Sequence, residues 1–445
     1  MNSTQLAHIS PGKVVLGSVF FTILVGALLL ALPQARNTYI PFIDLLFTAT
    51  SATCVTGLLT IHLSNFTLFG KGIILMLVQI GGLGLITMTL FVMSLFINMG
   101  MTTQLVAGKI LELESWKNIK QFIVFIIMLT LGIELIGVIC MLPIFLQHFS
   151  MAKALFLSTF YSISSFCNAG ISLFDGDMRH FSHHLGILSI VGFLVFCGGF
   201  GFITWHEIMR SIIARKNNKR FMFSLHSKII MYGTLTTITI FAVLFLVLEH
   251  NNTLSGMPFH LAIANALFHG ITMRSAGILS VPFMNLQLAT IFIMMVTSFI
   301  GSAPGSTGSG IKITTFALFL ATIKSAIRGK TSVEIWGRTI TRDQVFKSIA
   351  IVSLGVACIG FTTFMLLITE NMDFTDLFIE AISGFTNLGI STGITPMLSI
   401  LGKIFIMLSM IIGRIGALTL ILAFKLSAKP EALGFSYPEE RVMLS

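Results

Sequence analysis

The chain alternates between long apolar runs and short polar connections over its whole length. Eight runs are mainly apolar and about 20 residues long, which is the length that an α-helix needs to cross the hydrocarbon core of a bilayer. They cover residues 14–32, 72–97, 122–146, 185–205, 229–248, 288–321, 349–368 and 404–424. The pattern predicts an all-α integral membrane protein with eight spanning segments.

A shorter apolar segment lies between the two members of each successive pair of runs. These segments cover residues 41–52, 152–165, 259–271 and 374–384, and each is amphipathic and too short to span a bilayer. Each is followed by a cluster of small residues that ends in glycine. We therefore expect four short helices that enter the membrane and stop inside it, each followed by a non-helical loop.

The four small-residue clusters recur at nearly constant spacing, which predicts internal repeats. Their glycines lie 113, 107 and 112 residues apart, and a second glycine feature follows each cluster after 24 to 29 residues, at Gly82, Gly199, Gly301 and Gly413. The predicted repeats are residues 1–100, 101–222, 223–335 and 336–445. The clusters are Cys54-Val55-Thr56-Gly57, Cys167-Asn168-Ala169-Gly170, Arg274-Ser275-Ala276-Gly277 and Thr386-Asn387-Leu388-Gly389.

Composition supports a membrane location and limits the chemistry. Hydrophobic residues make up 55% of the chain and charged residues only 10%, whereas a soluble domain carries about 25% charged residues. The net charge of +10 would suggest nucleic acid in a soluble protein. Here Lys and Arg gather in the loops 99–120, 207–228 and 324–347, so the positive-inside rule predicts cytoplasmic termini and glycine clusters on the outer side.

No residue pattern in the sequence predicts catalysis. The five cysteines include no Cys-x-x-Cys pair, no His/Cys metal-ligand spacing is present, and no Walker motif predicts a nucleotide site. We expect neither an enzyme nor an organic cofactor in this chain.

Four non-helical loops at membrane depth suggest a pore. Such backbone is tolerated only where it is buried in protein or lines a water-filled cavity. If the loops converge on one axis, their carbonyl oxygens can replace the hydration shell of a small cation. No carboxylate lies within the four clusters, which favours a dehydrating carbonyl ring over a site for a hydrated divalent ion. A transporter with broken helices, whose glycines only pack, is the alternative.

The clusters, together with GSAPGSTGSGIKITTF at 301–316 and IIGRIGALT at 411–419, make the chain resemble the TrkH/KtrB/HKT superfamily of potassium transporters, and KtrB most of all. The resemblance implies four tandem units around one central pore, like a potassium channel fused into one chain. It implies that Gly57, Gly170, Gly277 and Gly389 belong to a selectivity filter that holds K⁺ at backbone carbonyls. Some HKT proteins with serine at the first position prefer sodium, so Gly57 favours potassium.

Two positions depart from the family pattern. Cys54 stands where threonine is commoner, and Asn387 makes the fourth loop bulkier than usual. These departures leave a Na⁺-selective or mixed Na⁺/K⁺ transporter of the same fold as the alternative function.

A glycine- and serine-rich segment interrupts the third inner span and cannot hold a firm helix. The resemblance implies an intramembrane gate at this segment, against a static kink as the alternative. Arg414 lies mid-span in the last run, where the family role is an electrostatic barrier and the alternative is a salt bridge, with Glu134 as a candidate. Lys312 either assists the gate or reaches toward the cytoplasm. The segment consists of Ala303, Pro304, Gly305, Ser306, Thr307, Gly308, Ser309 and Gly310.

Other charged and titratable residues near the clusters are expected to be structural. We expect Arg274 to point behind the filter toward Glu380 or Asp376, because a cation on the ion path would repel potassium. Asp44 and Asp376 suit the positive ends of the short helices that they begin. Five histidines are expected to be ordinary loop residues: His62, His180, His183, His184 and His269.

The resemblance also implies partners and a location. It implies a homodimer in a bacterial inner membrane, Na⁺-dependent potassium uptake, and a ring of KtrA-type nucleotide-binding subunits on the cytoplasmic side. The basic loops 207–228 and 324–347 and the tail are the candidate docking sites, although contact with anionic lipid explains their charge equally well.

Overall fold

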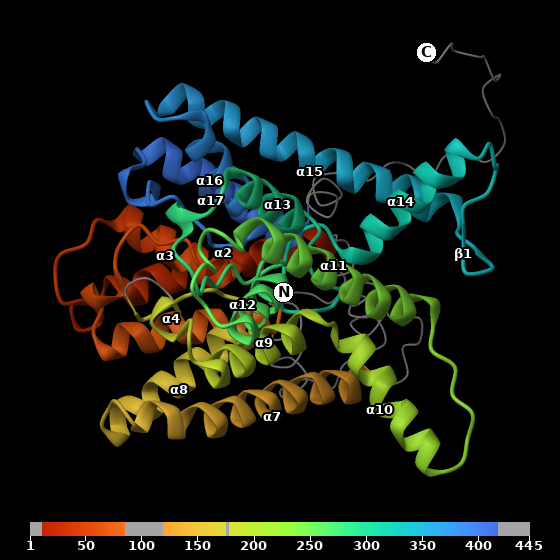
Figure 1. The fold of residues 1–445 in the computed structure, drawn as a ribbon. Helices are drawn as coiled ribbons and strands as arrows, with labels where there is room; N and C mark the ends of the chain where they lie inside the picture. Colours follow the sequence, from red (N-terminus) through yellow and green to blue (C-terminus); the bar gives the residue numbers. More distant parts are fainter. Residues whose placement is uncertain (1–10, 85–118, 175–177, 417–445) are drawn as a thin grey trace, which may run out of the picture.

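The computed structural model describes residues 11–84, 119–174 and 178–416, and in this part the chain is mostly helical (Figure 1). Long helices run in roughly the same direction, with shorter helices packed between them. The α-helices are α2 (Pro11–Ala31), α3 (Phe42–Cys54), α4 (Leu68–Gly82), α7 (Ile119–Leu146), α8 (Met151–Phe166), α9 (Leu185–Gly199), α10 (Phe202–Lys216), α11 (Leu225–Glu249), α12 (Phe259–Thr272), α13 (Leu288–Phe299), α14 (Ile313–Ile327), α15 (Arg342–Thr369), α16 (Phe374–Thr386) and α17 (Ile400–Ile415).

Short connecting elements complete the described part of the chain. They are the 3₁₀-helices η1 (Pro33–Ala35), η2 (Leu63–Asn65), η4 (Arg179–Phe181), η5 (Phe283–Asn285) and η6 (Thr395–Met397), and the strands β1 (Glu334–Ile335) and β2 (Arg338–Thr339). The second half of the predicted span 72–97, the end of the predicted span 404–424, the loop 99–118 and the C-terminal tail lie outside the described residues.

The four predicted short helices are confirmed as α3, α8, α12 and α16. Each follows a longer helix, namely α2, α7, α11 or α15, and each precedes an inner helix, namely α4, α9, α13 or α17. Each short helix ends within three residues of the start of its glycine cluster. The order long helix, short helix, loop, inner helix therefore occurs four times, while the exact repeat boundaries stay a prediction.

The expectation of eight spanning segments is wrong for the second inner span, which is not one straight helix. Among the described residues, three helices are long and apolar enough to cross a membrane alone, Gln121–Leu146, Leu225–Glu249 and Arg342–Thr369. The predicted span 185–205 is instead two helices, α9 and α10, bent by 97°. The span 288–321 is also broken, between α13 and α14, which confirms the interruption that the glycine- and serine-rich segment predicts. Hydropathy records only that these residues are apolar, whereas backbone geometry decides where the helix stops.

Three of the inner helices pack very closely against the short helix of their own repeat. A Cβ added at Gly81, Gly198 or Gly413 would lie under 3 Å from the carbonyl oxygen of Thr53, Phe166 or Phe385 respectively. Each of these three oxygens belongs to the residue four positions before the cluster glycine of its repeat. Only glycine allows this approach, which explains why the second glycine feature recurs along the sequence.

The helices close into a ring. Each short helix packs against the inner helix of the preceding unit: α8 against α4, α12 against α9, α16 against α13, and α3 against α17. The last pair joins the two ends of the chain through a shared apolar cluster that includes Phe47, Leu58, Ile406 and Met410. The packing order therefore returns to its start, as a central axis requires.

A buried ion pair reinforces the joint between the first and last units. Lys403 Nζ on α17 lies 2.7 Å from Asp44 Oδ1 in the first turn of α3. Lys403 is 9% exposed and Asp44 8%. Asp44 therefore lies at the start of its short helix, as expected, and also carries a counter-charge from another unit.

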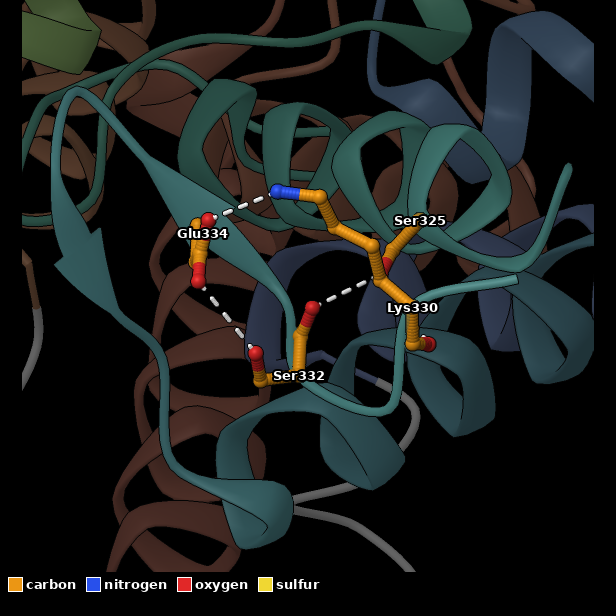
Figure 2. A network of polar contacts seen from close by, with 4 residues as sticks. All are labelled: Ser325, Lys330, Ser332 and Glu334. Carbon is orange, nitrogen blue, oxygen red and sulfur yellow. Dashed lines mark hydrogen bonds and ion pairs between the residues drawn. The ribbon is translucent and has the colours of Figure 1, made fainter. Parts of the chain in front are cut away.

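A small hairpin extends from the end of α14 (Figure 1). Figure 2 shows how it is held: Lys330 Nζ lies 2.9 Å from Glu334 Oε2, and Ser325 Oγ donates to Ser332 O over 2.7 Å. The hydrogen bond and the charge of Lys330 lower the pKa of Glu334. Trp336 at the turn packs edge-on against Tyr232 of α11, with 5.3 Å between ring centroids. The hairpin and α10 lie at the same end of the molecule, so both basic loops share one face.

The Asp44–Lys403 pair generates a stability prediction. Replacing Lys403 by Met leaves a buried carboxylate without its partner, which costs about 3–5 kcal/mol. We expect a clearly lower midpoint of thermal unfolding in detergent for Lys403→Met. The double variant Asp44→Asn/Lys403→Met should lose less than the two single variants together. Unchanged midpoints in both single variants would contradict a role for this pair in closing the ring.

Candidate functional site

The backbone after each short helix adopts conformations that favour glycine or asparagine. Val55, Asn168 and Asn387, two residues before the glycine in loops one, two and four, have positive φ of 59°, 61° and 53°. All four cluster glycines also have positive φ, between 60° and 96°. The short helices therefore end by turning the chain sharply back, and asparagine tolerates this conformation better than most residues.

The four cluster glycines meet one another around the axis. A Cβ at Gly57 would collide with the carbonyl oxygen of the residue before the next glycine, Ala169, and the other three glycines repeat this relation in order. Gly170 faces Ala276 O, Gly277 faces Leu388 O, and Gly389 faces Thr56 O. The four oxygens and the four glycines thus form one closed ring that has no room for a side chain.

The oxygens of this ring accept no hydrogen bond from the described part of the chain. The amides of the loops are bonded back to their own short helices: Thr56 N donates to Ser51 O over 2.8 Å, Ala169 N to Ser164 O over 2.8 Å, and Leu388 N to Ser383 O over 3.0 Å. Within the described residues, no hydrogen bond to the carbonyl oxygen of Thr56, Ala169, Ala276 or Leu388 is recorded. Four acceptors at membrane depth are left for a ligand that carries positive charge.

An open cavity of about 340 Å³ leads to the ring from one side. All four cluster glycines line it, together with loop side chains that include Lys71 and Arg179. The ring is therefore accessible to solvent from this side.

Two of the cluster side chains join neighbouring units instead of lining the axis. Thr56 Oγ1 donates to Asn387 Oδ1 over 2.5 Å, and Asn387 Nδ2 donates to Met410 O of α17 over 3.3 Å. The large side chain of Asn387, which the sequence marks as a departure from the family pattern, thus forms a hydrogen bond between loops one and four.

The two cluster cysteines lie behind the ring. Cys54 and Cys167 are fully buried, and the Cys167 thiol contacts Gln79 Oε1 at 3.8 Å and Glu134 Oε1 at 4.0 Å. The sequence offers no role for either thiol. The structure gives Cys167 a packing role against α4, where a Cβ on Gly82 would meet its sulfur.

The expected partner of Arg274 is wrong. Arg274 is 4% exposed, and its Nε and Nη2 atoms find no hydrogen-bond partner in the described part of the chain. Glu380 instead accepts hydrogen bonds from Thr395, over 2.8 Å, and from Ser391.

The segment 303–310 folds into a compact loop between α13 and α14. It is closed at its base by Gly301 N donating to Ile311 O over 2.9 Å, and it docks on the break between α9 and α10. There Ala303 N donates to Gly199 O over 3.1 Å, and Phe202 N donates to Gly305 O over 2.8 Å. Lys312 Nζ donates to Gly308 O over 2.7 Å, so Lys312 supports the loop.

Thr307 at the tip of this loop contacts the second glycine cluster and the helix end before it. Asn168 Nδ2 donates to Thr307 Oγ1 over 2.6 Å, and Thr307 Oγ1 donates to Phe166 O over 2.9 Å. Thr307 N also donates to Gly198 O over 3.1 Å. No sequence signal pairs Asn168 with Thr307, which lie 139 residues apart.

Arg414 binds the same loop from the opposite side. Its Nη1 donates to Thr307 O over 2.6 Å and to Ser309 Oγ over 2.9 Å, while its Nη2 donates to Gly81 O at the end of α4. The alternative of a salt bridge to Glu134 is wrong, because Glu134 accepts from Gln79 over 3.2 Å. Arg414 therefore joins the first unit, the loop of the third and its own helix in the fourth.

One histidine prediction is also wrong. His269 is fully buried in the last turn of α12, where it stacks on Phe245 with 4.5 Å between centroids and its Nδ1 lies 2.8 Å from Asn265 O. It is a packing residue of the third short helix, close to the third glycine cluster, and not a loop residue.

The chain is similar in sequence to known cation transport proteins. The family model TrkH, described as a cation transport protein, matches residues 17–432. The chain is 31% identical to the potassium/sodium uptake protein NtpJ of Enterococcus hirae over 98% of both chains. It is 34% identical to Ktr system potassium uptake protein B of Bacillus subtilis over 97% of this chain and 96% of that one.

A solved structure shares the fold. The potassium transporter TrkH from Vibrio parahaemolyticus matches with a TM-score of 0.72 at 19% identity, over 94% of this chain and 86% of that chain.

Proposed function

This chain belongs to the TrkH family of cation transport proteins, and on that premise we propose that it takes up potassium across the cell membrane through the ring of four carbonyl oxygens. It is a membrane protein of the TrkH fold, and the relatives described above are cation transporters, not enzymes.

The free carbonyl oxygens are the observation that carries this proposal. Four unbonded acceptors in a closed ring supply oxygen ligands that replace water around a dehydrated cation. The short helices turn their C-terminal ends, which carry partial negative charge, toward the same place. The four clusters contain no carboxylate, so a dehydrated monovalent ion fits the ring better than a hydrated divalent ion.

Potassium is the favoured ion, and sodium is the second candidate. Gly57 adds no side-chain oxygen to the ring, and all four ring oxygens are backbone carbonyls. The names of the relatives include both ions, since one is a potassium/sodium uptake protein and the other a potassium uptake protein. We propose that potassium passes with preference and that the uptake depends on sodium, as the resemblance implies.

The loop 303–310 and Arg414 form the gate in this proposal. The three hydrogen bonds of Arg414 join the loop to the end of α4, and each bond from a charged donor is worth about 1.5–3 kcal/mol. A fixed guanidinium close to the ion path also repels cations. Opening then requires Arg414 to release the loop, which its glycines allow to move.

Location and partners follow from the basic face. The hairpin and α10 gather Lys and Arg at one end of the molecule, which supports a cytoplasmic orientation of that end in a bacterial inner membrane. The bonds of Lys330 and Glu334 give the hairpin a fixed shape (Figure 2). We propose that this face docks a KtrA-type nucleotide-binding ring and that the transporter acts as a homodimer.

Growth rescue tests the proposed function. Expression of the chain should restore growth at low potassium to a bacterium that lacks its own potassium uptake systems. Gly277→Ala should abolish rescue, because its Cβ would meet Leu388 O, whereas Gly132→Ala on α7, with no atom within 4 Å, should rescue fully. Failure of the membrane-inserted parent chain, with or without a KtrA-type subunit, would contradict potassium uptake. Competition of rubidium uptake by K⁺ and Na⁺ would identify the sodium alternative.

Replacement of Arg414 tests the gate. Arg414→Ala removes all three bonds to the loop and to Gly81, so we expect the initial rate of rubidium uptake into proteoliposomes to rise severalfold. Arg414→Lys keeps the charge but cannot span three acceptors, so an intermediate rise is expected. A folded Arg414→Ala protein whose uptake is unchanged or lower would show that the residue is only a structural brace.

A further inference from the structure

Thr307 belongs to the gate loop 303–310 and is also hydrogen-bonded to the second filter loop. We propose that this residue couples the two, so that the position of loop 303–310 sets how well the ring discriminates potassium from sodium. This inference rests on the proposed function and adds a specificity role that acts through Asn168 and not through contact with the ion.

The coupling runs through four bonds around one residue. The Thr307 hydroxyl accepts from Asn168 Nδ2 over 2.6 Å and donates to Phe166 O over 2.9 Å. The Thr307 amide donates to Gly198 O over 3.1 Å, and its carbonyl accepts from Arg414 Nη1 over 2.6 Å. Thr307 is 1% exposed, so water does not replace these bonds when the gate is closed.

Asn168 transmits this bond to the ring. It holds a left-handed backbone with φ of 61°, and the next residue, Ala169, supplies one of the four ring oxygens. Its side chain makes one other hydrogen bond, a 3.4 Å contact from Nδ2 to Phe166 O. When the loop moves away, Asn168 loses its shorter bond, and the Ala169 carbonyl loses the support that fixes its direction.

The fourth loop offers an internal comparison. Asn387 occupies the equivalent place with nearly the same φ of 53°, but its amide is bonded to Met410 O and to Thr56, and not to the gate. When the gate moves, the second loop of the ring therefore loses a hydrogen bond, while the bonds of the fourth loop stay in place. Because coupling between two equilibria is reciprocal, the ion held in the ring also biases the gate.

Sodium inhibition of rubidium uptake in proteoliposomes tests this inference. The measured quantity is the ratio of the Na⁺ inhibition constant to the Rb⁺ KM. Thr307→Val keeps the shape of the side chain but removes the hydroxyl, and we expect the ratio to fall about threefold to tenfold, as the loss of one buried hydrogen bond implies. Thr307→Ser keeps the hydroxyl and should retain the parental ratio.

Thr297→Val is the matched control. Thr297 is buried on α13 in the same unit, and its hydroxyl donates to Ile293 O of its own helix. This variant should keep the parental ratio. Asn168→Leu, made from the other partner, should lower the ratio like Thr307→Val, and the double variant should lower it no further.

The outcomes separate the coupling from the function. An unchanged ratio in Thr307→Val and Asn168→Leu, whatever happens to the uptake rate, would overturn the coupling and leave potassium uptake standing. Additive effects in the double variant, or an equal fall in Thr297→Val, would overturn it as well. If Thr307→Val does not fold, Asn168→Leu and Thr307→Ala decide. A parent chain that takes up no rubidium would overturn both proposals.

Discussion

Backbone oxygens inside a membrane protein must find a partner, and four of them here accept no hydrogen bond from any described residue. The carbonyl oxygens of Thr56, Ala169, Ala276 and Leu388 each lie close to the cluster glycine of a neighbouring unit. A polar group without a partner costs free energy, so a cation or water in the open cavity must satisfy these oxygens. Much of the fold serves to hold these four groups in place.

Support for the ring comes from contacts between units that are far apart in the sequence. The Asp44–Lys403 pair and the Thr56–Asn387 bond both join the first unit to the fourth, which closes the circle. The same closeness fixes the loop 303–310, because Arg414 of the fourth unit reaches this loop in the third unit and α4 of the first. A substitution at one of these contacts between units therefore alters the packing on both sides of the axis.

The sequence predicts the parts of the structure that repeat, and it misses those that occur once. Gly81, Gly198 and Gly413 recur at regular spacing because each must approach a carbonyl of its own short helix. The partners of Arg414 and Asn168 depend on how the loop 303–310 folds under the second unit, and spacing along the chain carries no information about that. The sequence does not predict the 97° bend between α9 and α10, because apolar residues continue through the break. Charge alone predicts a carboxylate partner for Arg274, whereas packing leaves its Nε and Nη2 without one in the described residues.

Crystals of the protein soaked in rubidium and measured at the rubidium absorption edge test the central claim most directly. The account predicts an anomalous peak on the axis, surrounded by the carbonyl oxygens of Thr56, Ala169, Ala276 and Leu388, that excess potassium displaces more readily than excess sodium. A peak elsewhere, with no density at this ring under rubidium concentrations that saturate uptake, would contradict the claim that the four oxygens select the ion.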